Sequence, residues 1–353
     1  MEADELEDLV ALLAPLLRSL EVLGFIARHL NPPDFQAVME AAGEPDSDLR
    51  SVRARLDGWP ERLAGLRERL QRASDEALAA FAGLRSAQDL RDIFRALGHP
   101  ARAQEALYPL AADLPPVNRF FLEPARRDDT ALQERLADAE AAEDTGVHHE
   151  GGEPGARGGF SLYVPEYYSP DRAWPLVMAL HGGSGNGRAF LWSWLRDARS
   201  HGAILVAPTA SGETWALSGH DTDTPNLARI LDYVRDRWRI DPARLLLTGM
   251  SDGGTFAYVS GLEPGSPFTH LAPVAASFHP VIAQMADPER IAGLPIFLTH
   301  GVQDWMFPVD VARQARQALT AAGADVTYRE LEDLSHCYPR EINPQILAWL
   351  GER

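Results

Sequence analysis

Apolar side chains recur at alternating steps of three and four along the N-terminal part of the chain, most clearly in residues 6–30 and 56–77. This spacing gives each stretch one apolar stripe on an α-helix, and such a stripe must be buried against a partner. Pro-rich breaks at residues 31–33 and 114–116 interrupt the pattern, and four glycines are candidate helix ends: Gly43, Gly58, Gly83 and Gly98. We predict an antiparallel all-α bundle over residues 1–143, although heptad spacing also permits a homodimer through these N-terminal helices.

Residues 144–159 differ from both neighbouring regions, because they contain six glycines, one proline and almost no apolar residue. A segment of this composition cannot bury a core of its own, and it is typical of a flexible linker. We therefore expect it to separate the helical domain from a second domain over residues 160–353.

After residue 160 the pattern changes to short apolar runs that alternate with helical stretches. Continuous apolar runs favour strands that are covered on both faces, and their alternation with helices predicts a mostly parallel sheet. The predicted strands are residues 160–164, 176–180, 203–207, 245–248, 271–275, 296–299 and 326–331. The predicted helices are residues 226–238, 253–260, 309–322 and 344–350.

Composition and charge exclude several kinds of partner and active site. The net charge is -18, which argues against a nucleic-acid or anionic-membrane partner, since both recruit basic surfaces. All 33 cationic side chains are arginine, so a Schiff-base lysine, a Walker A lysine and a serine–lysine dyad are excluded. The single cysteine, Cys337, excludes an intrachain disulfide and a thiolate zinc cluster, and beside His336 it is expected to be a small packing residue.

The N-terminus is acidic, whereas a secretory signal needs a basic segment before its apolar run. The early apolar run over residues 9–17 contains Pro15, ends at Arg18 and is shorter than a membrane span. We therefore predict a cytoplasmic protein with no membrane span.

The strongest chemical signal is a Gly-x-Ser-x-Gly motif centred on Ser251, between Gly249 and Gly253. It directly follows a predicted strand and opens a predicted helix, which is the setting of a nucleophile elbow. Glycine fits two residues either side of the serine, where larger side chains would collide with their neighbours. The alternative is a glycine-rich turn with an incidental serine.

A serine nucleophile needs a base and an orienting carboxylate, which in this kind of fold follow in the order acid, then histidine. Asp304 and His336 both come after predicted strands and satisfy that order. His279 and His300 also follow strands, but they precede Asp304. Asp333 is close to His336 in sequence and stays open as an alternative acid.

The oxyanion of an acyl-transfer intermediate needs main-chain donors. We expect one from Asp252, directly after the nucleophile, and one from Gly183, in the glycine loop after the strand at 176–180. That loop is alternatively only a turn. Four residues are candidates for the substrate pocket, although aromatic side chains in loops are as often packing residues: Met250, Trp305, Phe307 and Trp215. Residues 220–223 are a candidate rim or short lid.

Residues 160–350 resemble the α/β-hydrolase esterases, especially the phospholipase/carboxylesterase and the polyhydroxybutyrate-depolymerase/feruloyl-esterase branches. The resemblance is carried by residues 162–165, 175–183, 249–254, His300 and Gly301 with Asp304, and His336. It implies an α/β-hydrolase fold, a Ser251–His336–Asp304 triad, no metal and no organic cofactor. The resemblance does not extend to the helical region over residues 1–143 and implies no function for it. The aspartate at 252, where many relatives have other residues, must be paired or turned away from the oxyanion.

The leading functional hypothesis is hydrolysis of a small-molecule carboxylic ester through an acyl-enzyme on Ser251. A thioesterase, a lysophospholipase or a peptidase would use the same three residues with another leaving group. The third hypothesis is an interaction protein whose helical domain is the main functional part, because fold alone does not prove activity.

Overall fold

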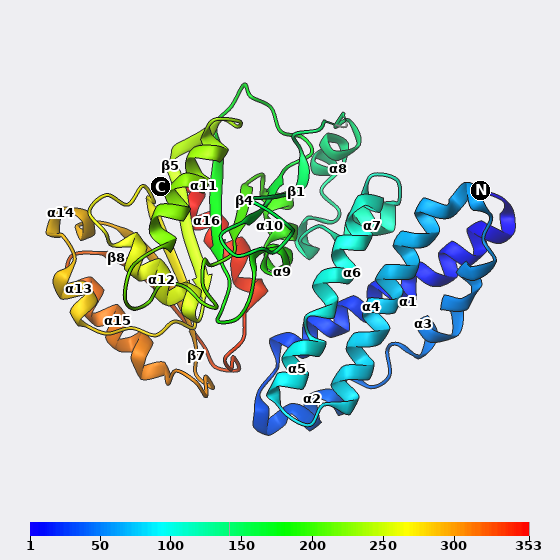
Figure 1. Ribbon diagram of the computed structural model, residues 1–353, viewed down its shortest axis with the longest axis horizontal. Coiled ribbons are helices and arrows are strands. Elements are labelled where there is room, and N and C mark those ends of the chain that lie inside the picture. The colour runs from blue at the N-terminus through cyan, green and yellow to red at the C-terminus, as the bar shows by residue number, and fades with distance from the viewer. Residues whose placement is uncertain (141, 353) are drawn as a thin grey trace. The chain divides into compact units, whose positions relative to one another are not determined.

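The computed structural model describes residues 1–140 and 142–352. It consists of two compact units, a helical unit from Met1 to Asp129 and a sheet unit from Thr130 to Arg353 (Figure 1). The predicted order of an all-α domain followed by an α/β domain is therefore present.

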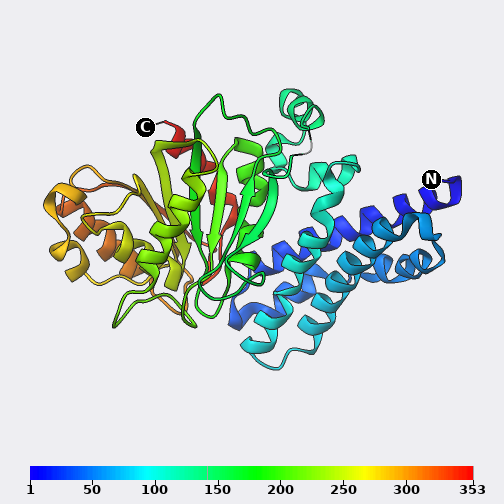
Figure 2. The ribbon, with the colours of Figure 1, turned by 45° about the horizontal axis from the view of Figure 1, so that its top comes forward.

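In the helical unit, α4 packs against α5 and α6, and α1 packs against α3 and α4 (Figure 2). The predicted stripe of the first helix forms the core of this unit, where Leu12, Leu16 and Leu23 of α1 are buried. The helices of the unit are α1 Ala3–Arg28, α2 Phe35–Ala42, α3 Ser47–Val52, α4 Ala64–Ser86, α5 Leu90–Ala96, α6 His99–Leu107 and α7 Pro115–Phe120.

Two details of the helical prediction were wrong. The second long helix begins at Ala64 instead of residue 56, because Trp59 precedes Pro60 and has an extended conformation (ψ 142°). Residues Arg53–Gly58 form a separate 3₁₀ segment.

Gly83, a candidate helix end in the sequence, lies inside α4 and ends no helix. A Cβ at this position would approach the Cβ of Ala96 to 2.9 Å, so the glycine allows α5 to pack closely.

Helix α1 has the length and composition of a membrane span, with a mean hydropathy of 2.0 over 18 residues. The apolar run seen in the sequence ends at Arg18, whereas the helix continues without a break to Arg28. Of the apolar window, 44% is buried within the structure, and the core helix of a soluble protein passes the same test of length and composition. The absence of a membrane span and the cytoplasmic location stay predictions.

The sheet unit contains an eight-stranded sheet in the order β1-β2-β4-β3-β5-β6-β7-β8. The pairs from β4 to β8 along this order are parallel, whereas β2 pairs antiparallel with both β1 and β4. The mostly parallel sheet predicted from the sequence is therefore confirmed. Its strands are β1 Gly146–Glu150, β2 Phe160–Val164, β3 Trp174–Leu180, β4 Ile204–Pro208, β5 Ile240–Met250, β6 His270–Val274, β7 Pro295–Gly301 and β8 Asp325–Leu331.

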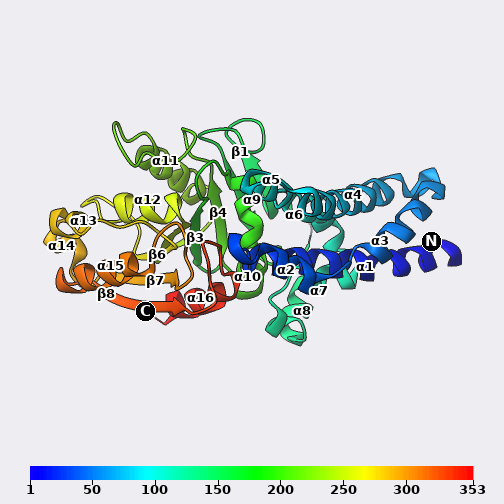
Figure 3. The ribbon, with the colours of Figure 1, turned by 90° about the horizontal axis from the view of Figure 1, so that it is seen from below.

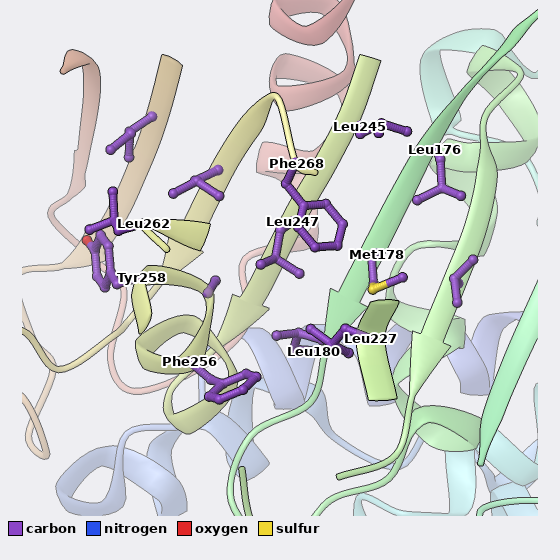
Figure 4. Close-up of a cluster of buried hydrophobic side chains, with 14 of the residues drawn as sticks. Leu176, Met178, Leu180, Leu227, Leu245, Leu247, Phe256, Tyr258, Leu262 and Phe268 are labelled. Carbon is purple, nitrogen blue, oxygen red and sulfur yellow. The ribbon is translucent and has the colours of Figure 1, made fainter. Parts of the chain in front are cut away.

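Helices cover both faces of this sheet. Helices α11 Asp223–Arg235, α12 Asp252–Gly261 and α15 Val309–Ala321 share one apolar core with alternate residues of β3 and β5 (Figure 4). Helices α10 Leu195–His201 and α16 Asn343–Gly351 contact each other on the other face, opposite α11 and α12 in Figure 3. Shorter helices complete the unit: α8 Thr130–Ala137, α9 Gly187–Phe190, α13 Val281–Met285 and α14 Pro288–Ile291.

The segment at 144–159 differs from the predicted linker, because Gly146–Glu150 form strand β1 and pair with β2. All residues of β1 are only half-buried and most are polar, so no apolar run marked it in the sequence. The glycines at 151, 152, 155 and 158, all with positive φ, form the connection between the two strands. The two compact units divide after Asp129, ahead of the predicted boundary at residue 143.

Candidate active site

Ser251 occupies a sharp turn between β5 and α12, with φ 54° and ψ -119°. The flanking glycines are required by close main-chain contacts, as the sequence argument expected. A Cβ at Gly249 would lie 2.5 Å from the carbonyl carbon of Gly253, and a Cβ at Gly253 would lie 2.4 Å from the carbonyl oxygen of His181. The turn therefore has the geometry of a nucleophile elbow.

The structure brings together the three residues expected to form the triad. His336 Nε2 lies 3.0 Å from Ser251 Oγ, and His336 Nδ1 lies 2.8 Å from Asp304 Oδ2. Asp304 follows β7 and His336 follows β8, so all three residues lie beyond the carboxyl ends of parallel strands. All three are buried. The alternative acid Asp333 is exposed to solvent, and the histidine contact is made by Asp304.

Asp304 is held by its own loop. Its Oδ1 accepts the main-chain N–H groups of Met306 (2.9 Å) and Phe307 (2.7 Å), which leaves Oδ2 facing His336. His300 Nε2 donates to the carbonyl oxygen of Phe307 (2.8 Å) and lies 3.4 Å from Asp304 Oδ2. Burial lowers the pKa of His300, which favours the neutral ring. The sequence had marked His300 as a competing base and as part of the esterase resemblance, but not as a support of the acid loop.

On the other side of Ser251, His181 orients the glycine loop. Its Nδ1 donates to the carbonyl oxygen of Gly182 (2.6 Å), and its Nε2 accepts the N–H of Ala210 (3.1 Å). Burial lowers the pKa of His181 to about 4, so the ring is neutral and its proton lies on Nδ1. Because the C=O and N–H of one trans peptide point in opposite directions, this bond turns the N–H of Gly183 away from the His181 ring.

The two residues expected to supply oxyanion donors lie close to Ser251. Within residues 1–140 and 142–352, neither the N–H of Gly183 nor that of Asp252 donates a hydrogen bond. Asp252 begins α12, whose N-terminus favours negative charge. A Cβ at Gly182 would lie 3.6 Å from the Cβ of Ser251, so the glycine loop passes beside the nucleophile.

The carboxylate of Asp252 is paired, as its position next to the nucleophile requires. Its Oδ2 accepts the hydroxyl of Thr214 at 2.6 Å. A Cβ at Gly183 would lie 2.7 Å from the same oxygen, so the carboxylate lies against the Cα of that glycine. No sequence signal had pointed to Thr214.

Among the residues that the structure describes, three other than glycine have positive φ, and each lies just after a central strand: Ser184, Ser251 and Ala275. Each donates its N–H to a main-chain carbonyl: Ser184 to Glu213 (3.2 Å), Ser251 to Val274 (2.9 Å) and Ala275 to Thr299 (3.0 Å). These main-chain bonds offset the unfavourable backbone conformation.

The four predicted pocket residues have different surroundings. Trp305 is 42% exposed, and the rings of Trp305 and Phe307 lie edge-on to His336 at 6.1 and 5.3 Å. Met250 is half-buried at the end of β5. Trp215 differs from the prediction, because it is buried and its indole N–H donates to the carbonyl oxygen of His181 (2.7 Å). Its position makes it a packing residue beneath the glycine loop.

Cys337 is buried, in agreement with a packing role. In the part of the chain that the structure describes, no group of three or more His, Cys, Asp or Glu side chains is placed to hold a metal ion.

Residues 218–348 match the phospholipase/carboxylesterase family. A bifunctional acetylxylan esterase/xylanase from Neocallimastix patriciarum is 29% identical over 156 residues, which are 43% of this chain and 22% of that protein. Feruloyl esterase C from Emericella nidulans is 26% identical over 158 residues, 43% of this chain and 56% of the relative. The match thus spans between about a fifth and about half of the length of these curated relatives.

Solved structures with similar folds include a ferulic acid esterase, 17% identical, covering 58% of this chain and 96% of that chain with a TM-score of 0.49. A thermostable esterase is 24% identical and covers 55% of this chain and 58% of that chain, with a TM-score of 0.47.

The parallel sheet and the strand–elbow–helix turn define the sheet unit as an α/β-hydrolase fold, preceded by a helical unit. Within that unit, residues 218–348 are similar to the phospholipase/carboxylesterase family. The predicted fold class and the resemblance stated from the sequence are both confirmed.

Proposed function

We propose that this protein is a serine hydrolase of carboxylic esters, with Ser251 as nucleophile, His336 as general base and Asp304 as orienting acid. The observation that carries the proposal is the continuous hydrogen-bonded path from Asp304 Oδ2 through the imidazole of His336 to Ser251 Oγ. The family match of residues 218–348 and the ester hydrolases among the relatives support the same activity.

In the proposed mechanism, His336 Nε2 takes the proton of Ser251 as Oγ attacks the ester carbonyl carbon. The negative charge that develops on the carbonyl oxygen is stabilised by the N–H groups of Gly183 and Asp252. His336 then returns the proton to the leaving alcohol, which departs and leaves the acyl group on Ser251. A water molecule, deprotonated by His336, releases the acid in a second step of the same kind.

For the substrate, we propose an ester with an apolar or aromatic group next to the carbonyl. Five large apolar side chains are exposed in the described residues of the sheet unit, and all follow the carboxyl ends of β4, β6 or β7: Leu217, Val281, Met285, Trp305 and Met306. Acetyl and feruloyl esters of carbohydrates are the first substrates to test, because the relatives are an acetylxylan esterase and a feruloyl esterase. The acidic net charge favours such a small molecule over nucleic acid.

The decisive experiment compares Ser251→Ala with the parent chain. Loss of the nucleophile should reduce hydrolysis of p-nitrophenyl acetate by about 10⁴-fold or more and abolish labelling by a fluorophosphonate. Ser218→Ala, a change at an exposed serine, is the matched control and should retain both signals. Undiminished labelling of the Ser251→Ala protein would contradict the proposal.

The leaving group is tested separately with matched acetyl esters and thioesters, a lysophospholipid and an aminoacyl amide. The highest kcat/KM should belong to an ester. A higher value for the thioester, the lipid or the amide would replace ester hydrolysis with the corresponding activity on the same triad.

A further inference from the structure

Three consecutive residues in the segment between β4 and α11 each contact the surroundings of the proposed oxyanion hole. The carbonyl oxygen of Glu213 accepts the N–H of Ser184 (3.2 Å), the hydroxyl of Thr214 donates to Asp252 Oδ2 (2.6 Å), and the indole N–H of Trp215 donates to the carbonyl oxygen of His181 (2.7 Å). Two of the partners, His181 and Ser184, lie on either side of Gly183 in the sequence, and the third partner is Asp252 itself. Both proposed donors are therefore held from one short segment.

Asp223, the first residue of α11, binds the main chain at both ends of this segment. Its Oδ1 accepts the N–H of Ser211 and its Oδ2 accepts the N–H of Ala216, both at 2.8 Å. The carboxylate is 1% exposed, and it lies at a helix N-terminus, where negative charge is favoured. Asp221 Oδ1 in turn accepts the N–H groups of Asp223 and Thr224. Residues 211–216 are thus fixed at both ends, and we refer to them as the 211–216 strap.

The strap is also packed against the nucleophile's helix. The Trp215 ring is stacked on Phe256 of α12, with centroids 5.5 Å apart and planes at 17°, and its centroid lies 4.9 Å from that of His181. Because α12 begins with Asp252 and His181 precedes the glycine loop, one indole contacts both elements that carry the proposed donors. A shift of the strap would change the distance between them.

We propose that the 211–216 strap sets the spacing of the oxyanion donors Gly183 and Asp252, and that Thr214 and Asp223 are positioning residues for the reaction. Thr214 holds the carboxylate of Asp252 against the Cα of Gly183, and Asp223 holds both ends of the strap. The proposal rests on the proposed ester hydrolysis. Donors that are fixed before the reaction stabilise the transition state more than the substrate. A change in their spacing should therefore lower kcat and leave KM unchanged.

The test uses the full chain with Thr214→Val, which removes the hydroxyl and keeps the shape, and Thr214→Ser, which keeps the hydroxyl. Thr214→Val should lower kcat for p-nitrophenyl acetate by about 10- to 100-fold with KM unchanged, since the loss of a whole oxyanion donor lowers kcat by about 10²- to 10³-fold. It should weaken binding of an aryl trifluoromethyl ketone, which forms a tetrahedral adduct with Ser251, by the same factor. Thr214→Ser should restore both to near the parent values.

Asp223→Asn should lower kcat in the same way, because an amide nitrogen cannot accept one of the two strap N–H groups. Ser218→Ala, just outside the strap, is the control and should match the parent. If the Asp223 variant does not fold, the Thr214 pair decides alone.

The proposal is overturned if Thr214→Val has parent-like kcat, if Val and Ser lower kcat equally, or if only KM changes. These outcomes leave the proposed function standing as long as the parent hydrolyses esters in a Ser251-dependent way. A parent chain without such hydrolysis overturns the proposed function itself, together with the role of the strap.

Discussion

Asp46 in the helical unit and Asp223 and Asp304 in the sheet unit are buried among different partners. In the helical unit, Asp46 is 1% exposed and is paired with Arg50 (2.5 Å) and Arg85, which join the start of α3 to the last turn of α4. In the sheet unit, Asp223 and Asp304 are also buried, but no arginine in the described chain pairs with either. Main-chain N–H groups and the imidazole of His336 surround them.

This difference separates a structural carboxylate from an orienting one. A guanidinium cancels the charge that it binds, so Asp46 contributes a contact between helices. N–H groups and an imidazole hold a carboxylate in place without removing its charge, so Asp304 can fix the tautomer of His336 and stabilise its protonated form.

The largest effect should follow from Asp304→Asn. The amide oxygen can still accept the N–H groups of Met306 and Phe307, but its NH₂ would face His336 Nδ1 and favour the wrong tautomer. We expect kcat for p-nitrophenyl acetate to fall by about 10⁴-fold, with the melting temperature nearly unchanged. A rate within about tenfold of the parent would contradict an orienting role.

Acid should destabilise the sheet unit before the helical unit. Burial holds the pKa of His181 at about 4, below the reference value of 6.5, so the unfolded chain takes up a proton at a pH where the folded chain does not. The free energy of unfolding should therefore fall as pH drops from 6.5 towards 4, by at most about 1.4 kcal/mol per pH unit. Burial lowers the pKa of His300 as well, which adds in the same direction.

Asp46 loses its contribution in the same direction, but only at lower pH. Burial alone would raise its pKa, but the hydrogen bonds and charge of Arg85 and the bond from Arg50 outweigh burial and hold the pKa below 3.8. Its contribution is complete above 3.8 and is lost only as pH falls through the lowered value. Hydrogen exchange between about pH 7 and pH 5, corrected for intrinsic rates, should show protection falling in β3 and β5 while α3 and α4 keep theirs. Earlier loss in the helices would contradict the contrast.

The smallest effect should follow from Asp46→Asn. The side chains of Arg50 and Arg85 are 56% and 33% exposed, so they can be hydrated again when the carboxylate is removed. We expect the free energy of unfolding to fall by about 2 kcal/mol in chemical denaturation, with ester hydrolysis unchanged. Asp48→Asn, at an exposed position in the first turn of α3, is the control. Equal effects of the two changes would mean that the buried pairing contributes nothing.

The sequence predicted the sheet and the three proposed catalytic residues because both leave local signals. Strand β2 has the predicted bounds, and β7 and β8 lie within a few residues of theirs. Ser251 was marked by glycines that local crowding requires, and Asp304 and His336 by their places after strands.

Other features depend on contacts that leave no local pattern. Strand β1 is half-buried and mostly polar, so its pairing with β2 was not visible. The bond from Thr214 to Asp252 spans 38 residues, and nothing near Thr214 in the sequence indicates it. Trp215 was assigned to a pocket because an indole in a loop has the same sequence context whether it is buried or exposed.

The three residues with positive φ at Ser184, Ser251 and Ala275 have a consequence for how this protein can change. Their backbone conformations are held by main-chain N–H···O=C bonds to neighbouring segments, which are the same for every amino acid except proline. Substitution of nearby residues should therefore leave the shape of the turn intact, except at Gly249 and Gly253, where close main-chain contacts leave no room for a Cβ. Insertion or deletion of a single residue in β5, β6 or β7 would shift the strand pairing and break these main-chain bonds. This part of the chain should therefore tolerate amino-acid substitution far better than any change in length.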